Sequence, residues 1–598
     1  MRRAPSHGRL GSPSAAYKTP ASREFRTASL SVRPARRIAM PMNAPHTPDR
    51  WTTHAGRDSN QPLHEVQFDD LLVRSLPADS ETLNQPRQVR GAMYTATHPT
   101  AVSAPTLLAW SDDLAHELGL QRPTHGDQSE AILAGNALAP GMRPYASRYG
   151  GHQFGNWAAQ LGDGRAITLG ELIDRAGQRQ ELQLKGAGPT PYSRTADGRA
   201  VLRSSVREFL CSEAMFYLGI PTSRALSLVG TGDQVVRDMF YDGHAAPEPG
   251  AVVCRVAPSF IRFGHFEILA AQAEPELLRQ LMDFVQAQHY PHCDGAVAWF
   301  TQLCERTAQL MVHWMRCGFV HGVMNTDNMS VLGLTIDYGP YGWLEGVDMN
   351  WTPNTTDAAG RRYCFGRQAQ IAHWNLGRLA SALNVVLDDA DALQQALQHY
   401  ADTFNWGFQH MLADKLGIGL APDIDRAADA AASEADASED GLSAELWPLL
   451  QLEECDFTLF FRRLAHVDVK LAADDGHDTE VLAPLHEAFY SGTGPGSATT
   501  IALRAWLRRW ATRVQAGGEP DAERIARMHR TNPKYVLRNW LAQRAIDDAA
   551  QGDTAMIDRL LLMMRRPYDE QPEFDDLAGR RPEWARHKAG CSALSCSS

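Results

Sequence analysis

The segment His321-Gly-Val-Met-Asn-Thr-Asp-Asn328, with Asp337-Tyr-Gly downstream of it, decides the fold class of this chain. Its spacing matches the catalytic loop of protein kinases, His-x-Asp-x-x-x-x-Asn, except at Val323, where a kinase has its catalytic aspartate. Asp337-Tyr-Gly stands where the metal-binding Asp-Phe-Gly of a kinase is found. A chance match of these few residues is the competing interpretation.

The same segment predicts the chemistry that the site can support. Asn328 and Asp337 carry hard oxygen donors of the kind that bind magnesium or manganese beside ATP. Valine can neither accept a proton nor orient a hydroxyl, so Val323 removes the usual base. Asp327 is the nearest carboxylate that could replace it. The chain is therefore either a dead kinase that only binds nucleotide or an enzyme with rearranged chemistry.

The pattern on either side of this segment predicts an α+β, bilobal, protein-kinase-like fold. Alternating apolar residues predict strands over 158–172, 181–185, 225–229, 234–239 and 251–256, and helical spacing predicts one helix over 199–218. Long helices are expected at 275–288 and 296–317, the second ended by Gly318, and the chain beyond 369 is mainly helical.

These shifts in pattern divide the chain into six parts. The expected divisions are a disordered leader at 1–60, a nucleotide-binding N-lobe at 65–270, a C-lobe with the catalytic loop at 271–421, an acidic mobile insertion at 422–442, a C-terminal helical region at 443–590, and a cysteine-containing tail at 591–598.

Three glycine- or cation-bearing sites in the N-lobe are candidates for holding phosphates. Gly162-Asp-Gly-Arg165 lets the backbone approach a phosphate closely and adds a guanidinium, although a plain hairpin turn explains Asp-Gly equally well. Lys185 ends a strand and Glu208 lies on the following helix, as in the ion pair of kinases, unless the two are unrelated surface charges. Asp197-Gly198 opens that helix, and its amides could face an anion.

Two arginines complete the set of cations that the sequence offers to a nucleotide. Arg255 is predicted on a strand and Arg262 at its exit, where each guanidinium could form a forked contact with phosphate oxygens. Arginines near strand ends are commonly surface residues, which is the alternative.

Composition narrows the range of functions. The 598 residues carry a net charge of −12, which argues against a general nucleic-acid binder. No run of about 18 apolar residues predicts a membrane span. The nine cysteines include no Cys-x-x-Cys pair near histidine, so a zinc site is not expected. We expect a monomer.

The first 45 residues are rich in Arg, Ser, Ala and Pro, and Glu24 is their only acid. This composition resembles a mitochondrial transit peptide. The alternative is a true start at Met40 or Met42, preceded by a translation artefact or a disordered leader. We expect a cytoplasmic protein, with a mitochondrial location as the alternative.

Three long blocks of the chain resemble the selenoprotein O family, also called YdiU proteins. They are Tyr149-Gly-Gly-His-Gln-Phe-Gly-Asn-Trp-Ala-Ala-Gln-Leu-Gly-Asp-Gly-Arg165, Leu184-Lys-Gly-Ala-Gly-Pro-Thr-Pro-Tyr-Ser-Arg194 and the loop from His321 to Asn328. The similarity runs from about residue 65 to the end and includes Asn532-Pro-Lys-Tyr-Val-Leu-Arg-Asn-Trp.

The resemblance implies a kinase-like fold that binds ATP in a flipped orientation. Such an enzyme transfers AMP to Ser, Thr or Tyr hydroxyls of proteins and releases pyrophosphate. It implies that Asp327 is the proton acceptor, that Asn328 and Asp337 hold the metal, and that Glu208 pairs with Lys185. The residues implied to contact ATP are Gly162, Gly164, Arg165, Lys185, Asp197, Gly198, Arg255, Arg262 and Asp337. An atypical kinase transferring the γ-phosphate and an ATP-binding pseudokinase scaffold are the alternatives.

The tail is a further point of resemblance. Cys596 falls where many members carry selenocysteine or cysteine, a residue linked in the family to redox control through a disulfide with the loop after the metal aspartate. Residues 345–357 of this chain contain no cysteine, and Cys364 is the nearest candidate, so an internal disulfide is in doubt. Cys591 and Cys596 are both expected to be exposed in the small, polar tail.

Overall fold

The computed structural model describes residues 60–598 except 241, 420–440, 492–495, 592 and 596–598. These residues belong to one compact unit, Pro41–Leu420 with Ser438–Ser598, and the other unit, Met1–Met40 with Ala421–Ala437, lies outside the described residues. The predicted leader, nearly all of the acidic insertion, and Cys596 therefore lie outside them too. The domain divisions stay predictions.

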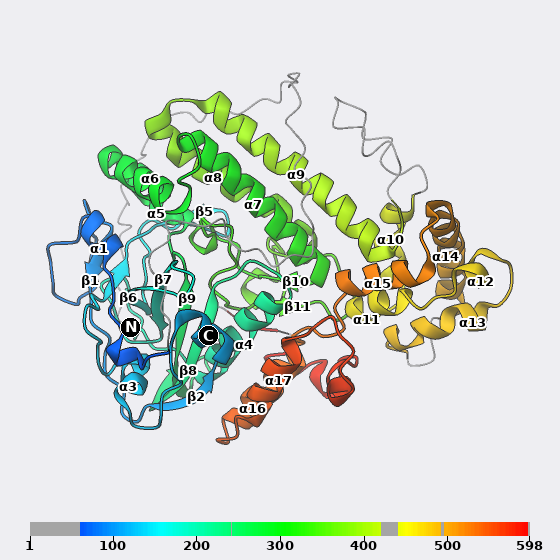
Figure 1. Ribbon diagram of the computed structural model, residues 1–598, viewed down its shortest axis with the longest axis horizontal. Helices are drawn as coiled ribbons and strands as arrows, with labels where there is room; N and C mark the ends of the chain where they lie inside the picture. Colours follow the sequence, from blue (N-terminus) through cyan, green and yellow to red (C-terminus); the bar gives the residue numbers. More distant parts are fainter. Residues whose placement is uncertain (1–59, 241, 420–440, 492–495, 592, 596–598) are drawn as a thin grey trace, which may run out of the picture. The chain divides into compact units, whose positions relative to one another are not determined.

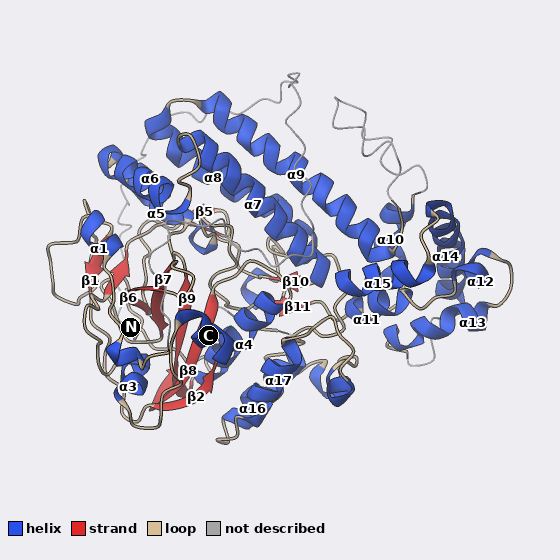
Figure 2. Cartoon of the chain, viewed as in Figure 1, coloured by secondary structure: helices blue, strands red, loops and turns tan. Residues whose placement is uncertain are grey.

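A seven-stranded antiparallel sheet forms the N-terminal half (Figure 2, red). Its strand order is β1-β3-β6-β7-β9-β8-β2. The strands are β1 (Tyr94–Ala96), β2 (Thr106–Trp110), β3 (Tyr145–Ser147), β6 (Ala166–Ile173), β7 (Arg179–Lys185), β8 (Arg224–Arg237) and β9 (Ala246–Ala257). Two short antiparallel strand pairs stand outside it: β4 (His152–Gln153) with β5 (Asn156–Trp157), which form a hairpin, and β10 (Phe319–Val320) with β11 (Gly342–Trp343).

Helices dominate the chain after the sheet, as Figure 1 shows. The helices up to α9 are α1 (Leu71–Ser75), α2 (Asp112–Leu118), α3 (Gln128–Ala134), α4 (Leu202–Tyr217), α5 (Phe263–Ala271), α6 (Pro275–His289), α7 (Ala296–Cys317), α8 (Gln368–Leu387) and α9 (Ala390–Leu416). The later ones are α10 (Leu442–Leu450), α11 (Phe457–Leu464), α12 (Val469–Ala473), α13 (Asp478–Leu482), α14 (Ser497–Gly517), α15 (Asp521–Thr531), α16 (Asn539–Ala549) and α17 (Ala555–Met564). The predicted order, a sheet-rich region followed by a helical one in an α+β chain, is confirmed.

Local signals set several boundaries correctly and misplace others. Pro275 occupies the first turn of α6, and Gly318, at φ 75°, ends α7 in the left-handed conformation that glycine tolerates best. The strand predicted over 158–172 begins only at Ala166, because the residues before it form a loop. The two strands predicted at 225–229 and 234–239 are one strand, β8, with an irregular register in its middle.

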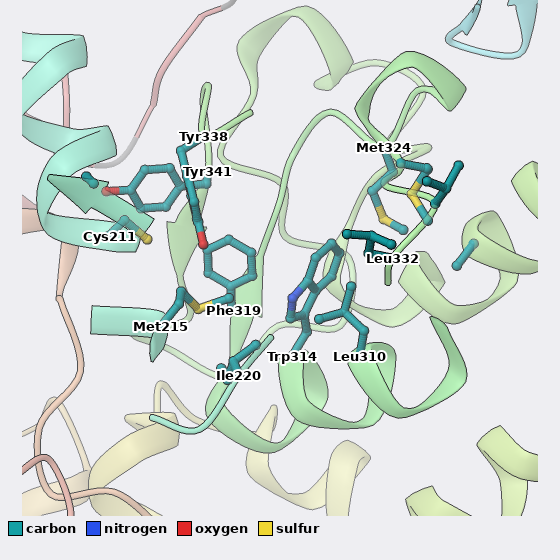
Figure 3. Packing of buried hydrophobic residues seen from close by; sticks show 14 of the residues in the cluster. Cys211, Met215, Ile220, Leu310, Trp314, Phe319, Met324, Leu332, Tyr338 and Tyr341 are labelled. Carbon is teal, nitrogen blue, oxygen red and sulfur yellow. The ribbon is translucent and has the colours of Figure 1, made fainter. Parts of the chain in front are cut away.

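An aromatic core lies directly beneath the segment that decides the fold (Figure 3). The Phe319 ring packs 5.7 Å from Tyr341 and 6.2 Å from Tyr338, measured between centroids. The His321 ring stacks on Trp314 at 5.4 Å, and its Nε2 lies 2.9 Å from the carbonyl oxygen of Ile336. This packing joins the catalytic loop to the segment that carries Asp337.

The C-terminal tail returns to the same region. Leu594 donates its N–H to the carbonyl of Pro353 (2.9 Å) and accepts from the N–H of Thr355 (2.7 Å). Asn354, between them, donates through Nδ2 to the carbonyl of Gly322 (3.0 Å). Cys591 is 2% exposed, so the expectation that it would be exposed is wrong. The tail therefore packs against the loop at 353–355, which itself contacts the catalytic loop.

Candidate active site

A buried ion-pair chain begins at the end of β7. Lys185 Nζ lies 2.7 Å from Glu208 Oε2 on α4, which is the ion pair that the sequence pattern predicts. The other Glu208 oxygen accepts from Arg255 Nη1 on β9 at 3.2 Å. Burial lowers the pKa of Lys185, and Glu208 opposes that shift. One carboxylate thus holds two cations on one face of the sheet.

Asp337 is the next member of the chain of charges. Its carboxylate accepts from both Arg255 and Arg262, the residue that precedes α5. Burial would raise the pKa of Asp337, but Arg262 and Arg255 outweigh it and hold the pKa well below its usual range. Its φ is 58°, a left-handed conformation that is uncommon for a residue other than glycine and that clusters at functional sites.

Arg262 connects Asp337 to the catalytic loop. Its Nη1 also donates to the backbone carbonyl of Asp327 (2.9 Å), and its guanidinium carbon lies 4.6 Å from the ring centroid of Tyr149. Arg262 is 1% exposed. The predicted alternative, that these arginines are surface residues, is wrong for both Arg255 and Arg262.

Asp327 has the surroundings of a proton acceptor. It lies in the short helical turn Thr326–Asn328 and is 7% exposed. Gln153 Nε2 donates to its Oδ2 (3.1 Å), whereas its Oδ1 is buried without a hydrogen-bond partner. Burial raises the pKa of Asp327 to about 7, which suits a group that must take up a proton near neutral pH.

The donors at Asn328 and Asp337 fit a magnesium ion that is shared with a nucleotide. Asn328 Nδ2 donates to the carbonyl of Val323 (2.9 Å), which leaves its Oδ1 to act as a ligand. Among the described residues no cluster of three His, Cys, Asp or Glu could bind a metal alone. Phosphate oxygens and water would have to complete the shell, which is how magnesium is usually held in nucleotide sites.

The turn at Gly162 and Gly164 lies close to the cation-rich face. Gly162 has a φ of 96°, and a Cβ there would meet the Tyr192 ring at 2.5 Å, so only glycine fits. Arg165, which follows, is next to the first residue of β6. Burial lowers the pKa of Arg165, while Glu208 and Asp337 raise it, which places its charge near that cluster. The turn is no hairpin between two strands.

Asp197 and Gly198 lie apart from the buried charges. Asp197 forms an ion pair with Arg237 at 2.7 Å and its side chain is 48% exposed. Gly198 packs so tightly on Gly188 that an added Cβ would lie 2.2 Å from its carbonyl carbon. Helix α4 begins at Leu202, so the expectation that this turn opens the helix is wrong.

Three residues of the site were not predicted. Gln183 accepts a hydrogen bond from Arg255, and it lies two residues before Lys185, on the same face of β7. The alternation of the strand could therefore have indicated it. Gln153, which contacts Asp327, and Asp163, which is buried and 4.0 Å from Arg262, stand inside the glycine-rich block but carry no local signal of these contacts.

Comparisons with known proteins identify the family of this chain. The family described as "Protein adenylyltransferase SelO" matches residues 83–565. A "Protein nucleotidyltransferase YdiU" of Nitrosospira multiformis is 56% identical over 561 residues, covering 90% of this chain and 97% of the relative. Another of that name, from Xanthomonas campestris pv. campestris strain B100, is 56% identical over 542 residues, 90% of this chain and all of the relative.

A solved structure, ROP2 of Toxoplasma gondii, is titled a virulence factor with a protein-kinase fold and no enzymatic activity. It covers 52% of this chain and 83% of its own, at 13% identity and a TM-score of 0.22, and such a likeness carries no argument. The family match and the relatives carry the assignment instead, and with the site described above they make the chain a protein nucleotidyltransferase that belongs to the protein adenylyltransferase SelO family.

Proposed function

We propose that this enzyme transfers AMP from ATP to Ser, Thr or Tyr hydroxyls of proteins and releases pyrophosphate. The hydroxyl oxygen attacks the α-phosphorus, the bond from that phosphorus to the bridging oxygen breaks, and the hydroxyl proton goes to a carboxylate. The observation that carries the proposal is Asp327, whose buried Oδ1 has no hydrogen-bond partner, in a loop that has valine at the kinase position.

The cations of the site supply charge for the triphosphate. Lys185, Arg255 and Arg262 converge on two carboxylates, Glu208 and Asp337, from three different elements. In this proposal the two arginines turn from Asp337 to phosphate oxygens when ATP binds, because forked guanidinium contacts suit phosphate. Arg165, Gly162, Gly164, Asp197 and Gly198 are the remaining proposed ATP contacts.

We assign the metal site to Asn328 and Asp337, with magnesium or manganese as the ion. A divalent cation there would neutralise phosphate charge when bound. Asp337 is free to act as a ligand only once the guanidinium groups leave its oxygens. The proposed acting unit is a cytoplasmic monomer with protein substrates, and the mitochondrial alternative rests on the leader. Among the described residues, no helix is both long and apolar enough to cross a membrane.

Labelled ATP separates this proposal from its two alternatives. The full chain is incubated with magnesium, candidate proteins and ATP that carries the label at either the α- or the γ-phosphate. Covalent α-label that is lost in Asp337→Ala is expected. γ-Label alone would identify a kinase, and tight ATP binding without either label would identify a pseudokinase scaffold.

A second experiment tests the role of the base. Asp327→Ala should abolish transfer and leave the ATP dissociation constant largely unchanged, because the Asp327 side chain is hydrogen-bonded to Gln153 and Arg262 contacts only the Asp327 backbone carbonyl, which the substitution keeps. An equal loss of ATP binding would show that Asp327 is structural.

A further inference from the structure

The β4–β5 hairpin is fastened onto the catalytic loop. His152 donates its N–H to Thr326 Oγ1 (2.7 Å), and Phe154 donates its N–H to Asn325 Oδ1 (3.2 Å). Gln153, between them, is the residue that contacts Asp327. The hairpin therefore borders the position at which an acceptor hydroxyl must meet Asp327. Its last residue, Trp157, is 39% exposed, although large apolar side chains are usually covered.

A cationic surface continues from this hairpin onto α8. Two guanidinium groups contact the Trp374 ring, with the Arg362 carbon 4.6 Å and the Arg378 carbon 5.2 Å from its centroid. The edge of the His152 ring meets the same indole at 5.5 Å, and His152 also packs 5.2 Å from Trp157. The two tryptophans and the two arginines thus form one surface beside the hairpin.

The charge of this surface is only partly offset by the protein, through the electrostatic interaction of Arg362 with Asp357. Arg362 and Arg378 form no ion pair in the part of the chain that the structure describes, and the Nε of each is buried without a hydrogen-bond partner. Nearby acids have other partners: Asp357 accepts from the backbone N–H groups of Arg362 and Tyr363, and Glu267 pairs with His152 at 2.5 Å. Unpaired arginines stacked on an aromatic ring are suited to bind carboxylates.

We propose that the surface formed by Trp157, Arg362, Trp374 and Arg378 binds acidic residues that flank the acceptor hydroxyl of a protein substrate. The inference rests on the proposed function and adds a substrate class to it. Acidic protein segments are favoured over nucleic acid because the enzyme is a protein nucleotidyltransferase and its overall charge is −12. The aromatic residues would cover the backbone of an extended segment on either side of the hydroxyl.

Peptide labelling by the full chain tests this assignment. Each peptide carries a single Ser, Thr or Tyr with Glu, Gln or Lys residues on either side of it. The peptides are incubated with the full chain, magnesium and α-labelled ATP. We expect kcat/KM for the Glu peptides to exceed that for the Gln peptides about tenfold and the Lys peptides to be poorest, as a few charge-assisted contacts would give. Arg362→Glu with Arg378→Glu should remove this order and leave the KM for ATP within about twofold.

Two further variants test whether a loss of structure, rather than a loss of charge, explains the result. Arg378→Gln removes one charge with little change in shape and should reduce the preference for Glu in part. Arg530→Gln, at an exposed arginine on α15, removes one charge as Arg378→Gln does and should keep both the activity and the order of the peptides. Melting temperatures of all variants are compared with that of the wild type.

Each alternative result has a distinct meaning. Equal labelling of Glu, Gln and Lys peptides by the wild type would overturn the inference, as would label on proteins but on no peptide. Inhibition by single-stranded RNA that the arginine variants relieve, without a Glu preference, would assign the surface to nucleic acid and overturn it too. Absence of α-label from every protein and peptide would instead refute the proposed AMP transfer on which the inference rests.

Discussion

Replacing Glu208 with glutamine should weaken ATP binding through Lys185. Glu208 is 2% exposed and contacts Lys185 at 2.7 Å and Arg255 at 3.2 Å, so it holds both cations in position. Glutamine has nearly the same shape but no charge, and its amide group would place donors against one of the two cations. The ammonium group would then lose the anchor that, in the proposed ATP site, directs it to the phosphates.

The expected change in the ATP dissociation constant follows from the contact that is lost. A hydrogen bond to a charged group contributes about 1.5–3 kcal/mol. At about 1.4 kcal/mol for each factor of ten, loss of the contact between Lys185 and phosphate should raise the ATP dissociation constant about 10- to 150-fold. Isothermal titration calorimetry of the full chain with magnesium–ATP measures this constant directly.

Glu213→Gln is a matched control on the same helix. Glu213 is 1% exposed and pairs with Arg224 through two contacts of 2.8 Å. Both substitutions break a buried ion pair and should cost about 3–5 kcal/mol of stability, but only Glu208→Gln should affect ATP. An ATP dissociation constant for Glu208→Gln within about twofold of the wild type, in folded protein, would refute the reasoning.

Three other substitutions test separate parts of the structure. Burial raises the pKa of Glu181 from 4.5 to about 8, so the folded protein holds a proton that the unfolded chain releases in this window. The melting temperature of the wild type should therefore decrease as the pH rises from 4.5 to about 8, and Glu181→Gln should make this decrease smaller. Asp456→Ala should lower the free energy of unfolding in urea by about 3–5 kcal/mol. The substitution leaves the buried guanidinium of Arg538 without the carboxylate that accepts its hydrogen bonds at 2.7 and 3.0 Å. Gly162→Ala should weaken ATP binding about tenfold in calorimetry, since a left-handed alanine is strained and its Cβ meets Tyr192.

Each of these predictions has a result that contradicts it. An unchanged pH slope in Glu181→Gln would mean that another group titrates in that window. Asp468→Ala, which removes only an exposed N-cap of α12, should lower the free energy of unfolding by about 1 kcal/mol. An equally small loss in Asp456→Ala would show that its ion pair with Arg538 does not stabilise the fold. Gly219 has a φ of 73° and open space around it, so equal weakening of ATP binding in Gly219→Ala would reject the close-approach argument.

Sequence patterns predict well what depends on neighbours in the chain. Lys185 and Glu208 could be paired because a strand and the next helix are adjacent in the fold, and the ends of α6 and α7 are set by a proline and a glycine. The site contacts that escaped prediction join distant segments. Gln153 and Asp327 are 174 positions apart, and nothing near either residue indicates that they meet.

Two wrong expectations have physical causes of the same kind. The tail around Cys591 is small and polar, but its burial depends on surfaces contributed by other parts of the chain, which composition does not reveal. The pattern predicts strand residues on both sides of the glycine turn before Arg165. Only the residues after the turn form a strand, β6, which pairs with β7. Local propensity states what a segment can form, and its partners decide what it does form.

The bond between Leu594 and the backbone at 353–355 has a consequence for how the enzyme is made. A ribosome releases the chain in sequence order, so Leu594 emerges 239 residues after Thr355, the loop residue that it pairs with. Until then Asn354, which holds Gly322 of the catalytic loop, lacks one of its neighbours. A chain cut short before Leu594 therefore lacks a backbone contact of the loop whose Asn354 binds the catalytic loop at Gly322.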